Sequence, residues 1–161
     1  MATTTEKKGM DTDVIDLSIN TVEKKRFRIN GDSNKILELH TSDVNIIPRL
    51  KEGYDKLTKL HEEISQINID EGSDGFNEVA DALRKLDTEM RKQIDYIFDS
   101  NVSEICAPFG SMYDLKDGKF VYEHIIETLA GLYGKDLSEE FKKLKTNTEK
   151  HTAKYTKAKR K

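Results

Sequence analysis

The sequence predicts a mainly helical α+β protein, with a small antiparallel β element near the N-terminus and a long antiparallel helical hairpin followed by C-terminal helices. Apolar and polar residues alternate in the first forty residues, which is typical of strands. Further along, apolar residues recur at spacings of three and four, which is typical of amphipathic helices. Charged residues make up 35% of the chain and hydrophobic residues another 35%. Narrow apolar seams on elongated helices account for so polar a composition.

The chain has 161 residues, enough for one domain with one core. We expect a loose leader over residues 1–12, a single α+β domain over 13–145 and a basic helical extension over 146–161. The leader lacks an apolar h-region, and no stretch reaches the roughly 18 apolar residues of a membrane span. Cys106 is the only cysteine, which excludes an intrachain disulfide and a thiolate metal cluster. A cytoplasmic location is therefore expected.

The first apolar pattern along the chain is that of strands. In "VIDLSIN", Ile15, Leu17 and Ile19 alternate with polar residues, as in a strand with one buried face. "RFRIN" and "KILEL" repeat the alternation on either side of a turn expected at residues 31–34, whose residue types tolerate positive φ. We predict a three-stranded meander, or a hairpin with one added strand, confined to about residues 13–40. This β element either covers the end of the helical hairpin, which we favour, or pairs its edge strand with another copy of the chain.

The helical hairpin is predicted over residues 48–67 and 76–98, with a polar break between the two helices. Pro48 fits the first turn of a helix, where its missing N–H costs nothing. Gly53 weakens the first helix by about 1 kcal/mol relative to Ala; it indicates either a close crossing or a tolerated break. The candidate N-caps of this helix precede Pro48 in the sequence: they are Thr41, Ser42 and Asp43.

The region after the hairpin is less regular. Asp117 and Gly118 are compatible with a type I′ hairpin or with a plain turn before a helix, and we favour the plain turn. The helix that follows, from about Phe120, is predicted to end at Gly134 as its C′ residue. Four other large residues are interpreted as core or core rim: Met90, Phe98, Phe109 and Met112.

A separate last helix is predicted from about Leu137, with an apolar stripe that thins where Thr148 and Thr152 replace apolar residues. Residues 141–161 hold nine Lys or Arg and one Glu, while the whole chain has a net charge of −3, so the remainder carries −11. We interpret this end as a partner-binding arm, which the acidic part of another copy could receive. Its candidate contact residues are Leu137, Phe141, Leu144, Lys154, Tyr155 and Lys157.

The basic end also allows a nucleic-acid reading, in which Lys and Arg neutralise phosphates and binding weakens with salt. We favour a solvated helix. Nucleic-acid binding uses aromatic side chains that stack on bases, and Tyr155 is the only aromatic residue interleaved with the charges.

The sequence predicts no catalytic, cofactor or metal site. The four His are scattered without an i, i+4 pair, and there is no carboxylate cluster, phosphate-binding glycine loop or GxSxG motif. Cys106 and His124 could form a nucleophile and base, but a free cysteine is more often a small core residue. We therefore expect a protein that is not an enzyme.

Two runs carry a family resemblance: "KRFRINGDSNKILELHTSDVNIIPRLKEGYDKLTKL" and "DGKFVYEHIIETLAGLYGKDL". They resemble small proteins encoded by phages and prophages of Gram-positive bacteria, over nearly the whole chain and most clearly over residues 25–60. The resemblance implies a tail assembly chaperone that coats the tape measure protein before the tail tube polymerises, located in the host cytoplasm or on the virion. A homo-oligomer is expected, and no catalytic residue is implied.

Two other functions stay open. The protein could be a structural component of the virion or tail, or a small nucleic-acid-binding regulatory protein that uses residues 142–161.

Overall fold

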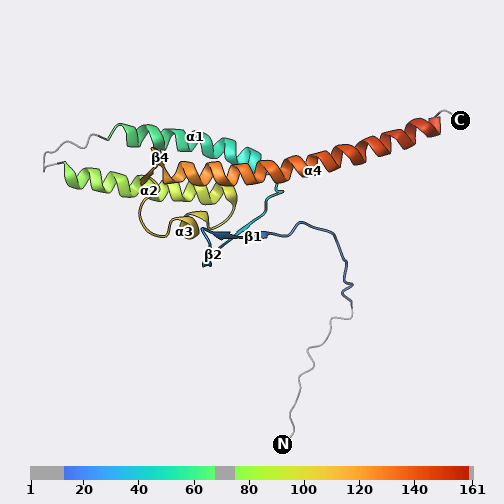
Figure 1. Ribbon diagram of the computed structural model, residues 1–161, viewed down its shortest axis with the longest axis horizontal. Coiled ribbons are helices and arrows are strands. Elements are labelled where there is room, and N and C mark those ends of the chain that lie inside the picture. Colours follow the sequence, from blue (N-terminus) through green and yellow to red (C-terminus); the bar gives the residue numbers. More distant parts are fainter. Residues whose placement is uncertain (1–12, 68–74, 160–161) are drawn as a thin grey trace, which may run out of the picture.

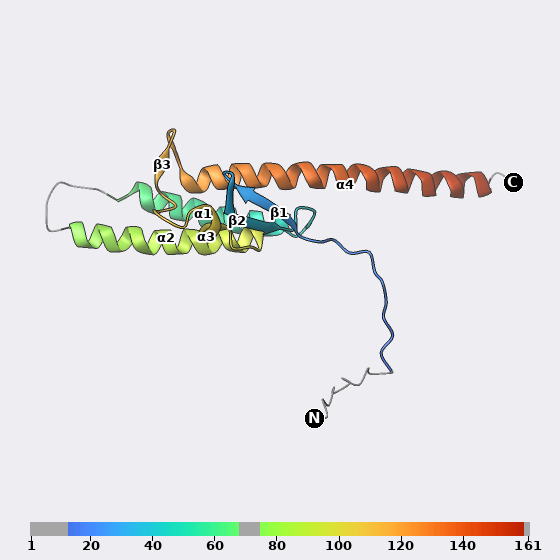
Figure 2. The same cartoon turned by 60° about the horizontal axis from the view of Figure 1, so that its bottom comes forward.

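The computed structural model describes residues 13–67 and 75–159 and confirms a mainly helical α+β fold (Figure 1). The expected leader, residues 1–12, lies outside the described residues. The first half of the last helix lies along a helical hairpin, and its second half projects beyond it (Figures 1 and 2). The elements in chain order are β1 (Lys25–Ile29), β2 (Asp32–Leu39), α1 (Ile46–Ser65), α2 (Phe76–Phe98), α3 (Val102–Cys106), β3 (Leu115–Lys116), β4 (Lys119–Phe120) and α4 (Val121–Lys159).

Helices α1 and α2 form the predicted antiparallel hairpin (Figure 1). Their facing seams are buried, with Leu57 of α1 and Met90 and Ile94 of α2 in one core. Gly53 is buried, and a Cβ built on it would collide with the side chain of Ile97. The glycine therefore marks a close crossing of α1 and α2, the first of the two readings that the sequence left open.

The N-terminal sheet has two strands, β1 and β2, paired antiparallel. Its connection is the dipeptide Asn30-Gly31, with φ of 51° and 72°. Positive φ at both positions is the type I′ geometry that joins two strands tightly. The turn expected at residues 31–34 is thus wrong, because Asp32 already belongs to β2. Leu37 and Leu39 are buried in the core of the helices, so the sheet covers that core as expected.

The third strand expected at residues 14–20 is wrong. These residues form no strand, and Ile15 and Leu17 are 83% and 80% exposed. In both views the segment runs away from the helices (Figures 1 and 2). An alternating pattern needs a strand edge to pair with and a surface to cover, and within this chain the segment meets neither.

A second small β element was not expected, since β structure was predicted only up to residue 40. Strands β3 and β4 pair around Asp117 and Gly118, whose φ values are 53° and 75°. This is a type I′ hairpin, so the favoured plain turn is wrong. Phe120 of β4 stacks on Tyr122 and meets Tyr113 edge to face, which anchors the hairpin to the body.

Helix α4 is continuous, so the predicted stop at Gly134 and the separate helix from Leu137 are wrong. A glycine ends a helix when it adopts a left-handed conformation, and Gly134 is not among the residues with positive φ. Tyr133 and Leu137, which lie four residues apart and therefore on one face, are both buried. Their burial outweighs the helix penalty of about 1 kcal/mol for a glycine.

The segment after α2 is held by three α2 side chains spaced one turn apart. Asp95 accepts hydrogen bonds from the backbone and hydroxyl of Ser103, at 2.7 and 2.8 Å. Arg91 donates to the carbonyls that follow α3, and Asp87 accepts from the backbone N–H of Met112 at 2.7 Å. These bonds satisfy backbone groups that no regular structure pairs.

The predicted core residues are confirmed with one exception. Met90, Phe98 and Met112 are buried, whereas Phe109 is 89% exposed. Phe109 lies between Pro108 and Gly110. The Arg91 guanidinium donates hydrogen bonds to the backbone carbonyls of Ala107 and Gly110, which fixes this loop with the Phe109 side chain in solvent.

Candidate protein-binding surface

The second half of α4, residues 138–159, projects from the body of the protein (Figure 2) and is here called the arm. Leu137 is buried in the protein's own core, so it is not part of the exposed surface. From residue 138 to 154 every side chain is exposed. Phe141 and Leu144, at 49% and 58% exposed, lie on the arm as expected. The expected domain boundary at residue 145 stays a prediction.

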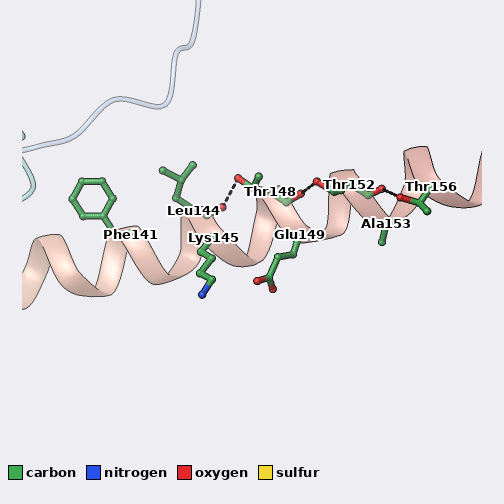
Figure 3. A pocket seen from close by; sticks show the side chains of 8 residues that line it. All are labelled: Phe141, Leu144, Lys145, Thr148, Glu149, Thr152, Ala153 and Thr156. Carbon is green, nitrogen blue, oxygen red and sulfur yellow. Dashed lines mark hydrogen bonds between the residues drawn. The ribbon is translucent and has the colours of Figure 1, made fainter.

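The arm carries an apolar stripe on one side. Figure 3 shows Phe141, Leu144 and three threonines in one row along the helix, with Lys145, Glu149 and Ala153 in the adjacent row. The hydroxyls of Thr148, Thr152 and Thr156 each donate to the carbonyl four residues earlier, at 2.9 Å. This bond satisfies each hydroxyl within the helix, and the three threonines are exposed. The stripe therefore continues past Leu144.

The remaining arm candidates are basic or aromatic. Lys154 is exposed on the described helix. The backbones of Tyr155 and Lys157 belong to α4, but their side chains lie outside the described residues. The structure thus brings Phe141, Leu144 and Lys154 onto one projecting helix.

An apolar groove of about 540 Å³ runs between α1 and α4. Its exposed wall on α1 includes Ile47 and Tyr54, which are 58% and 65% exposed. On the α4 side, the small residues Ala130 and Gly134 keep it open. We call it the α1–α4 groove. Its remaining lining is Ile46, Leu50, Lys51, Asp55, Phe98, Ile126, Tyr133 and Leu137.

A second cavity of about 500 Å³ extends the groove toward the start of α4. The two cavities share Tyr54 and Ile126, so they form one furrow along α1 and the first half of α4. The furrow is bordered mainly by acidic side chains: Asp55, Glu62, Glu123 and Glu127.

The far end of the furrow is closed by a pair of polar aromatic side chains. His61 Nδ1 and the hydroxyl of Tyr122 are hydrogen-bonded, which ties α1 to α4. Burial and the neighbouring Glu123 raise the pKa of Tyr122 to about 12, so its hydroxyl keeps its proton at neutral pH. The pair positions the two helices, and a tyrosine with so high a pKa is a poor general base at neutral pH.

The sequence candidates for chemistry are Cys106 and His124. Burial raises the pKa of the Cys106 thiol, whereas a cysteine nucleophile needs a lowered one. His124 uses Nε2 in a hydrogen bond with the carbonyl of Lys116, at 2.7 Å. Within residues 13–67 and 75–159, no three His, Cys, Asp or Glu side chains gather as a metal site would need. No helix in the described part of the chain is long and apolar enough to cross a membrane.

Sequence reasoning found the arm but missed the groove. The groove depends on how α1 and α4 approach each other, which no local pattern shows. Small residues four apart, Ala130 and Gly134, are the one signal that could have indicated it, because they lie on one helix face and leave room for another helix.

Comparisons of the chain with protein-family models, with curated proteins and with solved structures find no match. The exposed apolar groove and arm are therefore the main physical basis for a functional argument.

Proposed function

We propose that this protein is a non-enzymatic phage tail assembly chaperone that binds an amphipathic helical segment of a tail protein such as the tape measure protein. One observation carries the binding role: an apolar furrow with an acidic border opens to solvent, and α4, which forms one of its walls, continues beyond it as an exposed, apolar and basic arm. The family resemblance of residues 25–60 supports the tail role, with the host cytoplasm as the place of action.

The furrow has the form of a helix-binding site. Amphipathic helices bind grooves through apolar anchors at positions i, i+3, i+4 and i+7. Large exposed side chains such as Ile47 and Tyr54 supply contact area along one wall, and Ala130 and Gly134 let a helix approach the other. A chaperone needs no active site, only an adaptable apolar surface that a long helical partner can occupy and leave.

Capture of the tail protein tests the proposal. The chain is co-expressed with the tape measure protein of the same phage or prophage, and the tagged chain is purified at moderate salt. The double variant Ile47→Lys/Tyr54→Lys should lose the partner, because it places charges on the apolar wall of the groove. Both side chains are exposed, so the fold should tolerate the change. Leu115→Lys, at another exposed apolar residue, is the control and should retain the partner.

Three results would contradict the proposal. Equal capture by the groove variant and the control would exclude the groove as the binding site. A stoichiometric amount of the protein in purified particles would favour a structural virion component, and steeply salt-dependent DNA or RNA binding without capture would favour the nucleic-acid reading.

A further inference from the structure

We infer that two copies of this chain form a two-fold dimer in which their α4 helices pair antiparallel, so that the arm of each copy lies in the α1–α4 groove of the other. This dimer goes beyond the proposed function, since it concerns a second copy of the chain. Because both proposals use the same groove, a helix of the tail protein binds there only after it displaces the arm of the other copy.

The groove wall and the arm stripe lie on the same face of α4. From Ile126 the relevant residues follow at spacings of three, four or seven, which keeps them on one side of a helix. The helix is continuous throughout this stretch. A second α4 can therefore contact both halves of the face at once. The residues on this face are Ile126, Ala130, Leu137, Phe141, Leu144 and Thr148.

The two surfaces fit in length and in side-chain size. At about 1.5 Å per residue, residues 138–159 span about 33 Å, and residues 122–137 of the groove wall span about 24 Å. An antiparallel register that places Leu144 over Gly134 also places Thr148 opposite Ala130. Gly134 has the space for Leu144, since a Cβ built on it meets no atom within 4 Å.

Charge selects this arrangement over its alternatives. The arm is strongly basic, whereas the furrow is bordered mainly by carboxylates. In the same register the stretch of the arm that carries Lys150 and Lys154 lies along the stretch of α4 that carries Glu123 and Glu127. A parallel pair would instead set two basic arms side by side, and like charges repel. The antiparallel pair uses the same patch on both copies, so the assembly closes at two.

A pair of glycine variants tests the contact. The molar mass of the full chain, measured by light scattering at low salt and high micromolar concentration, should be that of a dimer. Gly134→Leu should shift the mass to that of a monomer, because the new side chain fills the place of Leu144 from the other copy. Gly131→Leu is the matched control, on the same helix with equally open space around it, and should remain dimeric.

At a protein concentration low enough for both variants to be monomeric, Gly134→Leu and the control should melt at the same temperature, because both glycines have open surroundings; at higher concentration only the dimeric control should gain stability. A monomeric wild-type chain, or a Gly134→Leu variant that stays dimeric, would overturn the inference.

Cysteine pairs test the orientation. In a Cys106→Ala background, the double variant Ala130→Cys/Thr148→Cys should oxidise to a covalent dimer, because the two positions face each other across the pair. Each single variant should stay uncrosslinked, because in the antiparallel register neither position lies opposite the same position of the other chain. Efficient crosslinking of a single variant would show a parallel pair and overturn the inference.

The dimer should also weaken as added salt shortens the Debye length below about 10 Å.

Discussion

Gly53 and Gly131 show that the same residue type has opposite consequences in different surroundings. Gly53 is buried where α1 crosses α2, and the side chain of Ile97 occupies the space next to it. Gly131 is exposed on α4, with no atom within 4 Å of a Cβ built on it.

Gly53→Ala should lower the free energy of unfolding by about 1–3 kcal/mol, because overpacking outweighs the gain in helix propensity. Gly131→Ala should instead raise it by about 1 kcal/mol, since only the propensity gain remains. Urea unfolding of both variants measures the two effects. A stabilising Gly53→Ala would show that the helices do not cross closely at this point.

Asp136 joins the N-terminal sheet to α4. Its carboxylate accepts hydrogen bonds from the buried hydroxyl of Thr41 and from the Lys25 ammonium, the latter at 2.9 Å. The Thr41 bond first, and then Lys25, lower the pKa of Asp136 below its ordinary value. A lowered pKa means that folding favours the charged form of the carboxyl group.

The contribution of Asp136 to stability should therefore depend on pH. It is present above the ordinary aspartate pKa of about 3.9, and it is lost as the pH falls through the lower pKa of the folded chain. Between about pH 6 and pH 3, the wild type should lose more stability than Asp136→Asn, which cannot titrate at this position. Thermal melts across this range measure the difference, and parallel pH profiles would contradict this role for Asp136.

At the level of elements, the sequence predicts those helices that the local spacing of apolar residues determines. The apolar spacing placed α1 and α2 within about two residues of their observed ends. The failures arise where tertiary contacts decide. Residues 14–20 alternate like a strand but meet no edge, and Gly134 stays helical because its neighbours Tyr133 and Leu137 are buried. Next to the Asp117-Gly118 hairpin, Phe120 meets His61 of α1 edge to face, a contact distant in sequence.

The end of the arm should be removable without loss of the fold. Residues 146–154 are exposed, so deletion of residues 146–161 removes no buried side chain in the part of the segment whose side chains are described. The melting temperature of the monomer should stay nearly unchanged, while self-association should weaken, because the deletion removes the end of the stripe and most of the basic charge. Melts and size-exclusion runs at low and high salt measure both properties. A collapsed fold with unchanged association would show that the arm belongs to the core.

At the level of the whole molecule, α4 does two things with one continuous helix. Its first half completes the core over the α1–α2 hairpin, and its second half projects as the arm (Figure 2). Of the candidate site, Phe141, Leu144 and Lys154 could be predicted, because charge and period are visible in the sequence. Leu137 lies on the same stripe but before the point where the helix leaves the body, which only the packing of α4 determines.

Hydrogen exchange along the arm tests most directly whether this surface binds protein. A lone helix of this kind is marginally stable in water, so its amides exchange quickly unless another surface covers it. We expect protection of residues 141–156 to rise with protein concentration, to be lost in Gly134→Leu and to be kept in Gly131→Leu. Fast exchange of these residues at every concentration, with or without the tape measure protein, would contradict a protein-binding role for the arm.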